Sequence, residues 1–310
     1  RKLYVTFFKD YTHKLWGIPS NKLSSDWAAE RISLLNLWDV ALRLCGLGRE
    51  APRTYTKKYF YPKQGIGQIF EFVSREIKQN GGNIILNARF IKLLLEGGRV
   101  KGVIYETNGK DQVINCDWVI STIPVTDLIC MPDRGVGYQD VSTAISSLRY
   151  RSLRFLNILI DKAEIGRNTW TYIPDGKYIM TRIQEPNKRS PHNAPDGKTS
   201  LMLEIPCSYK GEIWNMQDDL LFSRCIDDLF KLGIDIKDRV IDYFYTAERH
   251  AYPIYHLDYK HHLNNLLSRV DSIKNIHTCG RNGLFRYIFM DRAMEMGFEA
   301  ATIVDVKKNL

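Results

Sequence analysis

The decisive stretch of this 310-residue chain is residues 275–291, with the sequence NIHTCGRNGLFRYIFMD. Ile276 to Thr278 predict a short strand, which leads into two glycines, Gly280 and Gly283. A glycine lets a phosphate approach the backbone, and the guanidinium of Arg281 supplies a fixed positive charge for it. The same spacing also fits a plain turn, so the pattern alone leaves a phosphate site and a structural turn both open.

The residues after this stretch predict a helix with one smooth face. Asp291 is a good N-cap, so we expect the helix to begin there. Small residues recur at i, i+4, i+7 and i+8, namely Ala293, Gly297, Ala300 and Ala301. Such a face can lie close to another backbone and brings the positive N-terminal end of the helix with it. The alternative is that the alanines only pack a core helix.

A second strand signal lies upstream, at Trp118-Val119-Ile120, which is short and apolar. The sequence Ser-Thr-Ile-Pro at residues 121–124 follows it as a loop. This order is typical of a buried strand that ends at the carboxyl edge of a sheet. Ligands bind at such edges in open α/β sheets, so we expect the loop to belong to a binding site.

A β-meander is predicted just before that strand. Gly97-Gly98 and Asn108-Gly109 are turn signals, and they separate the apolar runs 90–95, 100–106 and 112–115. Earlier still, apolar spacings of three and four predict a helix over residues 68–80, which Gly81-Gly82 ends, and residues 83–87 read as a strand.

The rest of the chain predicts a helical beginning and a second, mixed region. Residues 3–44 have a helical pattern, with Ser24 or Ser25 as the cap of its second helix. The pattern is already under way at Arg1, so we expect that a preceding segment is missing. After residue 124 the chain alternates predicted strands (155–160, 169–173, 201–205 and 240–247) with helices (218–232 and 259–270), and 184–199 is expected to be an exposed loop.

Composition excludes several classes of function. Forty-four Lys and Arg against 35 Asp and Glu give a net charge of +9, but the basic residues are scattered, which disfavours nucleic acid. The six cysteines stand far apart without Cys-x-x-Cys pairs, which predicts a reduced, cytoplasmic protein without a metal site. His261-His262 has no matching ligand nearby, and no apolar run is long enough to predict a membrane helix.

The segment 280–291 resembles the C-terminal flavin-contacting motif of UDP-galactopyranose mutases, with Gly-Arg, Arg-Tyr and Met-Asp at the same spacing. Similar endings occur in proteins that resemble protoporphyrinogen oxidase. The segments around Phe7-Phe8 and Trp16-Gly17, around Tyr61-Pro62-Lys63 and at 121–124 are similar to the same families, in the same order. The chain therefore resembles the FAD-dependent superfamily of protoporphyrinogen oxidases, amine oxidases and these mutases.

This resemblance implies a mixed α/β and α+β fold with three parts. Residues 61–124 and 279–310 would form a partial FAD/NAD(P)-binding, Rossmann-like domain that contains the β-meander. Residues 125–278 would form an inserted α+β substrate-binding domain, and residues 1–60 would be its helical layer. The expected partners are a small-molecule or nucleotide-sugar substrate and a second copy of the chain in a homodimer.

The resemblance also implies the site residues. Tyr287 matches a phosphate-binding tyrosine of the mutases by position, and Tyr255 is a candidate for a second one. Phe90 stands near a position where the family, usually with Val, makes a backbone contact to the adenine. No general base is assigned, because His250 and His256 have no identifiable partner and are expected to be structural. The expected FAD-contacting residues are Phe90, Thr122, Pro124, Gly280, Arg281, Met290, Asp291, Arg292 and Ala293.

One departure from the family affects the cofactor prediction. These flavoproteins begin with a strand, a Gly-x-Gly-x-x-Gly turn and a helix that hold the pyrophosphate. The only near match is at residues 65–70, where Phe70 replaces the third glycine, and we expect a helix-entry turn there. Three hypotheses follow: an FAD-dependent oxidoreductase with unknown substrate, a mutase-like flavoenzyme, or a non-catalytic fragment. The isolated chain is expected to retain little or no FAD.

Overall fold

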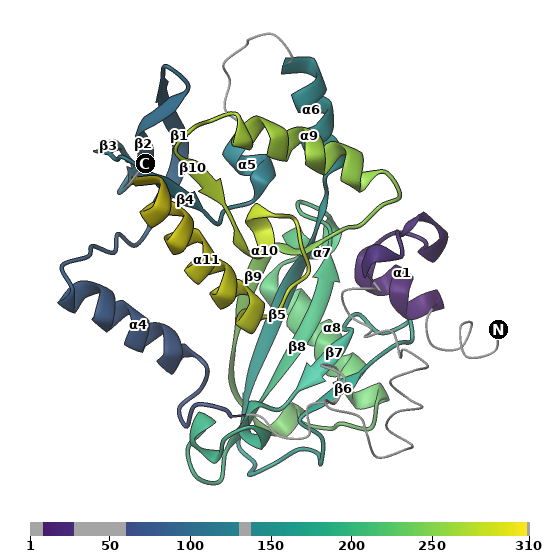
Figure 1. Cartoon of the computed structure of the whole chain (residues 1–310). Helices are drawn as coiled ribbons and strands as arrows, with labels where there is room; N and C mark the ends of the chain where they lie inside the picture. Colours follow the sequence, from purple (N-terminus) through teal and green to yellow (C-terminus); the bar gives the residue numbers. More distant parts are fainter. Residues whose placement is uncertain (1–8, 28–59, 130–137, 309–310) are drawn as a thin grey trace, which may run out of the picture. The chain divides into compact units, whose positions relative to one another are not determined.

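The computed structural model describes residues 9–27, 60–129 and 138–308 (Figure 1). These residues form two compact units. The first contains residues 9–23, 60–84 and 151–251, and the second contains residues 24–27, 85–129, 138–150 and 252–308. Each unit combines segments that are far apart in the sequence, and together they confirm the predicted mixture of α/β and α+β structure.

A five-stranded sheet forms the centre of the first unit, in the order β6-β7-β8-β5-β9 (Figure 1). β5 pairs antiparallel with β8, and Leu156 lies opposite Leu203. Both side chains are fully buried, as are Ile158 and Ile160 on β5, because alternate residues of a strand point to the same face. The strands are β5 (Tyr150–Ile160), β6 (Trp170–Tyr172), β7 (Arg182–Gln184), β8 (Thr199–Cys207) and β9 (Val240–Pro253).

One long helix, α8 (Asp218–Lys231), completes the core of this unit. Its apolar stripe places Leu221, Cys225 and Leu229 in the same buried cluster as the strand residues. The other helices of the unit are α1 (Asp10–Trp16), η2 (Ser20–Lys22), α4 (Gly67–Gln79), η3 (Pro186–Lys188), η4 (Pro191–Asn193), α7 (Glu212–Asn215) and η5 (Lys237–Arg239). Most of the helical pattern predicted over residues 3–44 lies outside the described residues.

The segment 184–199 was predicted to be an exposed loop, and this is wrong for several of its residues. Glu185 is buried, and its carboxylate accepts hydrogen bonds from the Ile165 and Gly166 amides at 2.9 and 3.1 Å and from the Thr199 hydroxyl at 3.0 Å. A polar side chain can be buried when all its oxygens are paired in this way. The loop is therefore organised around one carboxylate.

The predicted helix over 68–80 is confirmed as α4, but the predicted strand over 83–87 is wrong. Ile85 and Leu86 are 48% and 75% exposed, and no strand pairs with them in the described part of the chain. A strand forms only where a neighbour accepts its backbone hydrogen bonds, and the apolar pattern cannot report whether that neighbour is present.

The second unit contains the predicted β-meander and a parallel pair of strands. In the meander, β2 lies between β1 and β3, and both turn signals lie at its ends. β4 and β10 run parallel, with Ile120 opposite His277. The elements are β1 (Ala88–Glu96), β2 (Arg99–Thr107), β3 (Lys110–Asn115), β4 (Val119–Ser121), α5 (Val125–Ile129), α6 (Tyr138–Ser147), α9 (Tyr259–Asp271), β10 (Ile276–Thr278), α10 (Gly280–Gly283) and α11 (Met290–Lys308).

Asn275 joins the meander to the parallel pair. Its side-chain amide donates to the carbonyls of Val100 and Asp117 at 2.8 and 2.6 Å, and its Oδ1 accepts from the Val100 amide at 2.7 Å. With 1% of its surface exposed, Asn275 uses both ends of its amide inside the unit. This side chain therefore links the meander to the β4–β10 pair, together with the hydrogen bond from the Lys274 amide to the Gly98 carbonyl at 3.0 Å.

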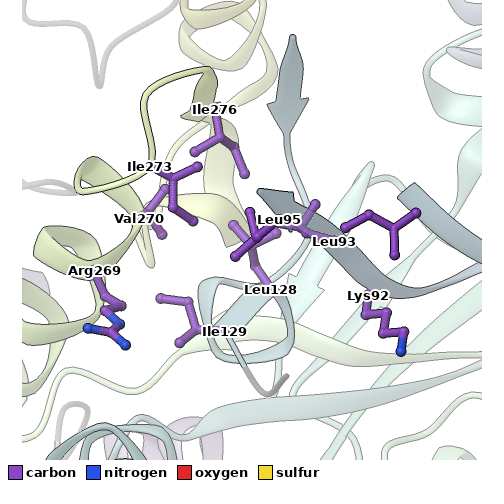
Figure 2. A pocket seen from close by; sticks show the side chains of 10 residues that line it. Lys92, Leu93, Leu95, Leu128, Ile129, Arg269, Val270, Ile273 and Ile276 are labelled. Carbon is purple, nitrogen blue, oxygen red and sulfur yellow. The ribbon is translucent and has the colours of Figure 1, made fainter. Parts of the chain in front are cut away.

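The second unit also has a cavity of about 330 Å³ between β1, α5, α9 and β10 (Figure 2). Its walls are mainly aliphatic, from residues such as Leu93, Leu128 and Ile273, and Lys92 and Arg269 bring the only charges among the lining residues. No residue predicted to bind the cofactor or the substrate lines this cavity, and the candidate site lies elsewhere in the unit.

Candidate functional site

The candidate site is the carboxyl edge of the β4–β10 pair, where two segments distant in the sequence meet. The Cys279 amide donates to the Ser121 carbonyl at 2.9 Å, which continues the parallel pairing past the end of both strands. The loop 121–124 and the Gly280 turn therefore leave the sheet side by side. Thr122 is exposed there, whereas Pro124 is buried, and its carbonyl accepts the first hydrogen bonds of α5.

Both glycines of the decisive stretch have a physical reason to be glycine. Gly280 has a φ of 78°, in the left-handed region that side chains disfavour. A Cβ on Gly283 would lie 2.7 Å from Thr278 Oγ1 and 3.2 Å from the Ser121 carbonyl oxygen. The short helix α10 therefore lies directly against the strand edge, where sequence reasoning predicted only a turn or loop.

Two buried polar atoms at this edge have no hydrogen-bond partner. They are the Ser121 Oγ, at the end of β4, and the Asn282 Oδ1, on α10. A buried polar atom without a partner carries a desolvation cost and is rare in proteins. Both atoms can receive a hydrogen bond from a bound molecule, and Ser121 can also donate one.

The residues after α10 end it with an unusual cap. The Arg286 amide donates to the Arg281 carbonyl at 2.8 Å and the Phe285 amide donates to the Asn282 carbonyl at 3.3 Å, which is the Schellman pattern. The left-handed residue of this motif is usually glycine, but here it is Phe285, with a φ of 51°. The Phe285 ring is completely buried, so packing holds a strained backbone in place.

Arg281 packs over two adjacent aromatic rings. Its guanidinium carbon lies 4.4 Å from the centre of the Tyr287 ring and 5.2 Å from that of Tyr252. Its Nη1 donates to the Ile288 carbonyl at 3.1 Å. The structure therefore gives Arg281 a role in holding the loop before α11, and its predicted contact with the cofactor stays a prediction.

Tyr255 lies beneath the same loop and is only 1% exposed. Its hydroxyl accepts a hydrogen bond from the Tyr287 amide at 2.7 Å. The predicted role of Tyr255 in binding substrate stays untested, but this geometry favours a role in which the hydroxyl serves the protein backbone. Tyr287 is also mostly buried, next to Tyr252 and Phe289.

The helix α11 begins one residue earlier than predicted. It starts at Met290, because the Phe289 carbonyl accepts the first helical bond, from Ala293 at 3.1 Å. Asp291 thus lies in the first turn, where its charge favours the positive end of the helix, and is not the N-cap. Met290 and Phe289 are exposed at the start of this helix, and the amides of a first helical turn have no intrahelical partner.

The face predicted to approach another backbone is only partly buried. Ala300 is fully buried, but Gly297 is exposed and a Cβ there would meet no atom within 4 Å. The guanidinium of Arg292 pairs with Glu295 and Glu299 on its own helix, both at 2.9 Å. Within the described residues no backbone lies against Gly297, so the predicted close approach stays a prediction there.

Phe90 lies on the meander strand β1, apart from the sequence segments that build the glycine edge. It is opposite Tyr105, next to a register shift between Phe90 and Lys92. Such an irregularity leaves backbone groups outside the regular ladder. A backbone contact from this position is compatible with the geometry, and the assignment of Phe90 to the adenine stays a prediction.

Burial determines the titration of the ionisable groups around this edge. It raises the pKa of the Cys279 thiol and, most strongly among the causes, the pKa of the Tyr150 phenol. It also lowers the pKa of His256, and electrostatic repulsion from the nearby His262 and Arg149 lowers it further. The Cys279 thiol and the Tyr150 phenol therefore keep their protons near pH 7, and His256 stays in its neutral form.

Two classes of site find no support in the described residues. No three His, Cys, Asp or Glu side chains gather in a way that could hold a metal ion. No helix of the described chain is both long and apolar enough to cross a membrane.

Comparison with known proteins shows the family. The sequence model of the flavin-containing amine oxidoreductases matches residues 20–305, so the chain belongs to this family. The family carries a flavin, in agreement with the FAD predicted from the 280–291 motif. The near match at 65–70 is not a pyrophosphate turn, because α4 begins at Gly67 and no strand precedes it in residues 60–66.

Solved structures show the fold. A reduced UDP-galactopyranose mutase superposes with a TM-score of 0.71 at 21% identity, covering 92% of this chain and 61% of its own. A putative protoporphyrinogen oxidase from Exiguobacterium sp. 255-15 gives 0.57 at 16% identity, with 78% and 50% covered. A redesigned variant of putrescine oxidase gives 0.54 at 12% identity, with 79% and 53% covered. The chain thus spans about three fifths of the length of the mutase that it matches.

The edge of the second unit brings together several groups that a bound molecule can contact. These groups are the amides of the first α11 turn, the backbone of Gly280, which no side chain covers, and two unpaired polar atoms, Ser121 Oγ and Asn282 Oδ1. The turn that binds the FAD pyrophosphate in this family is not found in the described residues, where no strand leads into a Gly-x-Gly-x-x-Gly sequence.

Proposed function

We propose that the protein is an FAD-dependent oxidoreductase of the amine oxidase and protoporphyrinogen oxidase type, with its flavin ring at the β4–β10 edge. The observation that carries this proposal is the convergence of the Gly280 turn, the 121–124 loop and the first turn of α11 on one side of a parallel strand pair. Ligands bind at this place in open α/β sheets. FAD, when bound, supplies hydride acceptance from the substrate.

The residues of this chain would hold and polarise the ring. The amides of the first α11 turn, at Met290 and Asp291, point away from the helix and favour negative charge at the adjoining ring edge. Gly280 lets the backbone approach closely, and the Ser121 hydroxyl gains the partner that it lacks. Arg281 fixes the loop that leads into the helix, through the Ile288 carbonyl.

A mutase-like use of the flavin is the second candidate. The similarity to UDP-galactopyranose mutase at a TM-score of 0.71 concerns the fold. Of the two tyrosines suggested for a substrate diphosphate, Tyr255 has its hydroxyl engaged by the Tyr287 amide, which weakens this alternative. Purified protein can decide between them with two probes: putrescine, which should bleach the flavin anaerobically if the protein oxidises this amine, and UDP-galactopyranose, which a mutase would isomerise only with reduced flavin.

The experiment that tests the proposal uses protein from the complete open reading frame. We expect a bound flavin, seen by its visible absorption, and a measurable Kd for FAD after the flavin is removed. Arg281→Ala should weaken FAD binding about tenfold to a hundredfold, because it removes an anchored charge. Arg269→Ala, an exposed arginine of the same unit, is the matched control and should leave the Kd unchanged. A complete protein that neither carries nor takes up FAD would refute the proposal.

Further details of the whole protein also remain proposals. We propose a cytoplasmic location, supported by four unpaired cysteines among the described residues: Cys116, Cys207, Cys225 and Cys279. The homodimer, the nucleotide-sugar substrate and the division into cofactor domain (61–124 and 279–310) and substrate domain (125–278) rest on the family resemblance. The expectation that this chain alone retains little FAD is checked by the same absorption measurement on residues 1–310.

A further inference from the structure

We propose that Tyr255 is a positioning residue of the flavin site: its buried hydroxyl holds the backbone of Tyr287 and thereby sets where helix α11 begins. This inference rests on the proposed function, since it takes the first turn of α11 as the surface that faces the flavin ring. It assigns Tyr255 a role different from direct contact with a substrate.

The contact is specific to one atom. The Tyr287 amide donates to the Tyr255 hydroxyl at 2.7 Å, and the acceptor lies on a side chain with 1% exposure. Because water has almost no access to this site, loss of the hydroxyl would leave a buried amide without its partner. The hydroxyl therefore determines the position of Tyr287 more strictly than an exposed contact would.

The ring of Tyr255 is fixed by its neighbours. It stacks on Tyr259 with ring centres 4.6 Å apart and an interplanar angle of 19°. It also lies 6.1 Å from the ring of Phe285, the strained residue that caps α10. A rigid donor or acceptor is a better positioning group than a mobile one, because no rotamer freedom is lost when it binds.

A second tyrosine holds the other end of the same loop. The Tyr150 hydroxyl donates to the Asn282 carbonyl at 3.2 Å, and its ring meets Phe285 edge-on at 4.9 Å. The chain between Asn282 and Tyr287 is thus pinned at both ends by phenol groups and at its centre by the Phe285 ring. Since Met290 follows closely on Tyr287, a shift of the Tyr287 backbone is transmitted to the first turn of α11.

Tyr259 provides a matched control within the same aromatic cluster. It is buried like Tyr255 and stacks on it, but its hydroxyl bonds the carboxylate of Asp26, which also pairs with Lys260. Tyr255→Phe and Tyr259→Phe are thus the same chemical change on neighbouring rings. Tyr255→Phe removes a hydrogen bond to the loop that precedes α11, whereas Tyr259→Phe removes the one to Asp26.

The experiment compares the two variants in the full-length protein, by FAD titration and by the visible spectrum and reduction potential of the bound flavin. Tyr255→Phe should weaken FAD binding about fivefold to a hundredfold and shift the potential, because a buried amide loses its acceptor and the helix start moves. Tyr259→Phe should leave both within about twofold of the unsubstituted protein, even if it lowers thermal stability as much. Equal effects of the two variants on the flavin would overturn the inference.

Two further results keep this test decisive. If Tyr255→Phe does not fold, amide hydrogen exchange in the unsubstituted protein replaces it, and a Tyr287 amide that exchanges as fast as an exposed peptide would overturn the inference. If the unsubstituted full-length protein binds no FAD, the proposed function itself fails, and this inference fails with it. If FAD binds normally and only the difference between the variants is missing, the proposed function stands without the positioning role.

Discussion

Phe285 gives the sharpest test of the structure, because its backbone and its side chain make opposite demands. The backbone has a φ of 51°, which costs an ordinary residue about 1–2 kcal/mol compared with glycine. The ring is fully buried against Tyr150, Tyr255 and Tyr259. Removing a buried phenylalanine ring costs about 3–5 kcal/mol, so any truncation should destabilise the protein.

The informative measurement is the order of two truncations, Phe285→Ala and Phe285→Gly. Both lose the ring, but glycine also relieves the backbone strain. Against this, glycine is more flexible in the unfolded chain, at a cost of about 0.5–1 kcal/mol. We therefore expect Phe285→Gly to be more stable than Phe285→Ala by up to about 1 kcal/mol, the reverse of the usual order.

Urea unfolding followed by circular dichroism measures this difference, with the neighbouring residue as its control. Leu284 has a φ of −106°, so Leu284→Ala should be more stable than Leu284→Gly by about 0.5–1 kcal/mol. If Phe285→Ala proves more stable than Phe285→Gly by the same margin as at Leu284, the left-handed conformation is wrong and the Schellman cap with it.

Two other perturbations follow from the structure. Gly283→Ala should destabilise the protein by about 1–3 kcal/mol, because the new Cβ would lie 2.7 Å from Thr278 Oγ1. Gly297→Ala should stabilise α11 by up to about 1 kcal/mol, because its Cβ would meet no described atom within 4 Å. Thermal unfolding of both variants checks this pair, and equal effects on the melting temperature would contradict it. The folded-state pKa of His256 lies below its unfolded value of about 6.5, so the folded protein resists protonation and should lose stability as the pH falls through 6.5. Urea unfolding between pH 5 and 7.5 should give a flatter pH dependence for His256→Gln, and an unchanged slope would show that His256 does not contribute.

Elements of the second unit were predicted correctly where the residues that determine them lie within the element itself. Gly97, Asn108 and Gly109 adopt positive φ in the turns of the meander, as residues of these types do in tight turns. A strand was predicted at residues 118–120 because apolar residues run directly into the loop before Pro124, and β4 is found one residue later, at Val119–Ser121. In each case the short local sequence is enough to predict the element.

The parts that could not be predicted depend on partners distant in the sequence. Nothing in the sequence near Phe285 distinguishes it from a core phenylalanine, because its left-handed backbone is stabilised by Tyr150 and Tyr255 from other segments. Sequence reasoning singled out Tyr255 by its motif, but only the structure reveals that its hydroxyl meets the Tyr287 amide. The apolar residues 83–87 show the opposite failure, since the pattern of a strand is present but its pairing neighbour is not among the described residues.

Asn275 has a consequence for how motion passes through the second unit. Its side-chain amide pairs with both the N–H and the carbonyl of Val100, as a peptide group of a neighbouring strand would. Because Asn275 directly precedes β10, a displacement of the meander at Val100 is passed to the strand that leads into the Gly280 turn. A partner that binds the outer strands of the meander would therefore act on the Gly280 turn through Asn275, without contacting the turn itself.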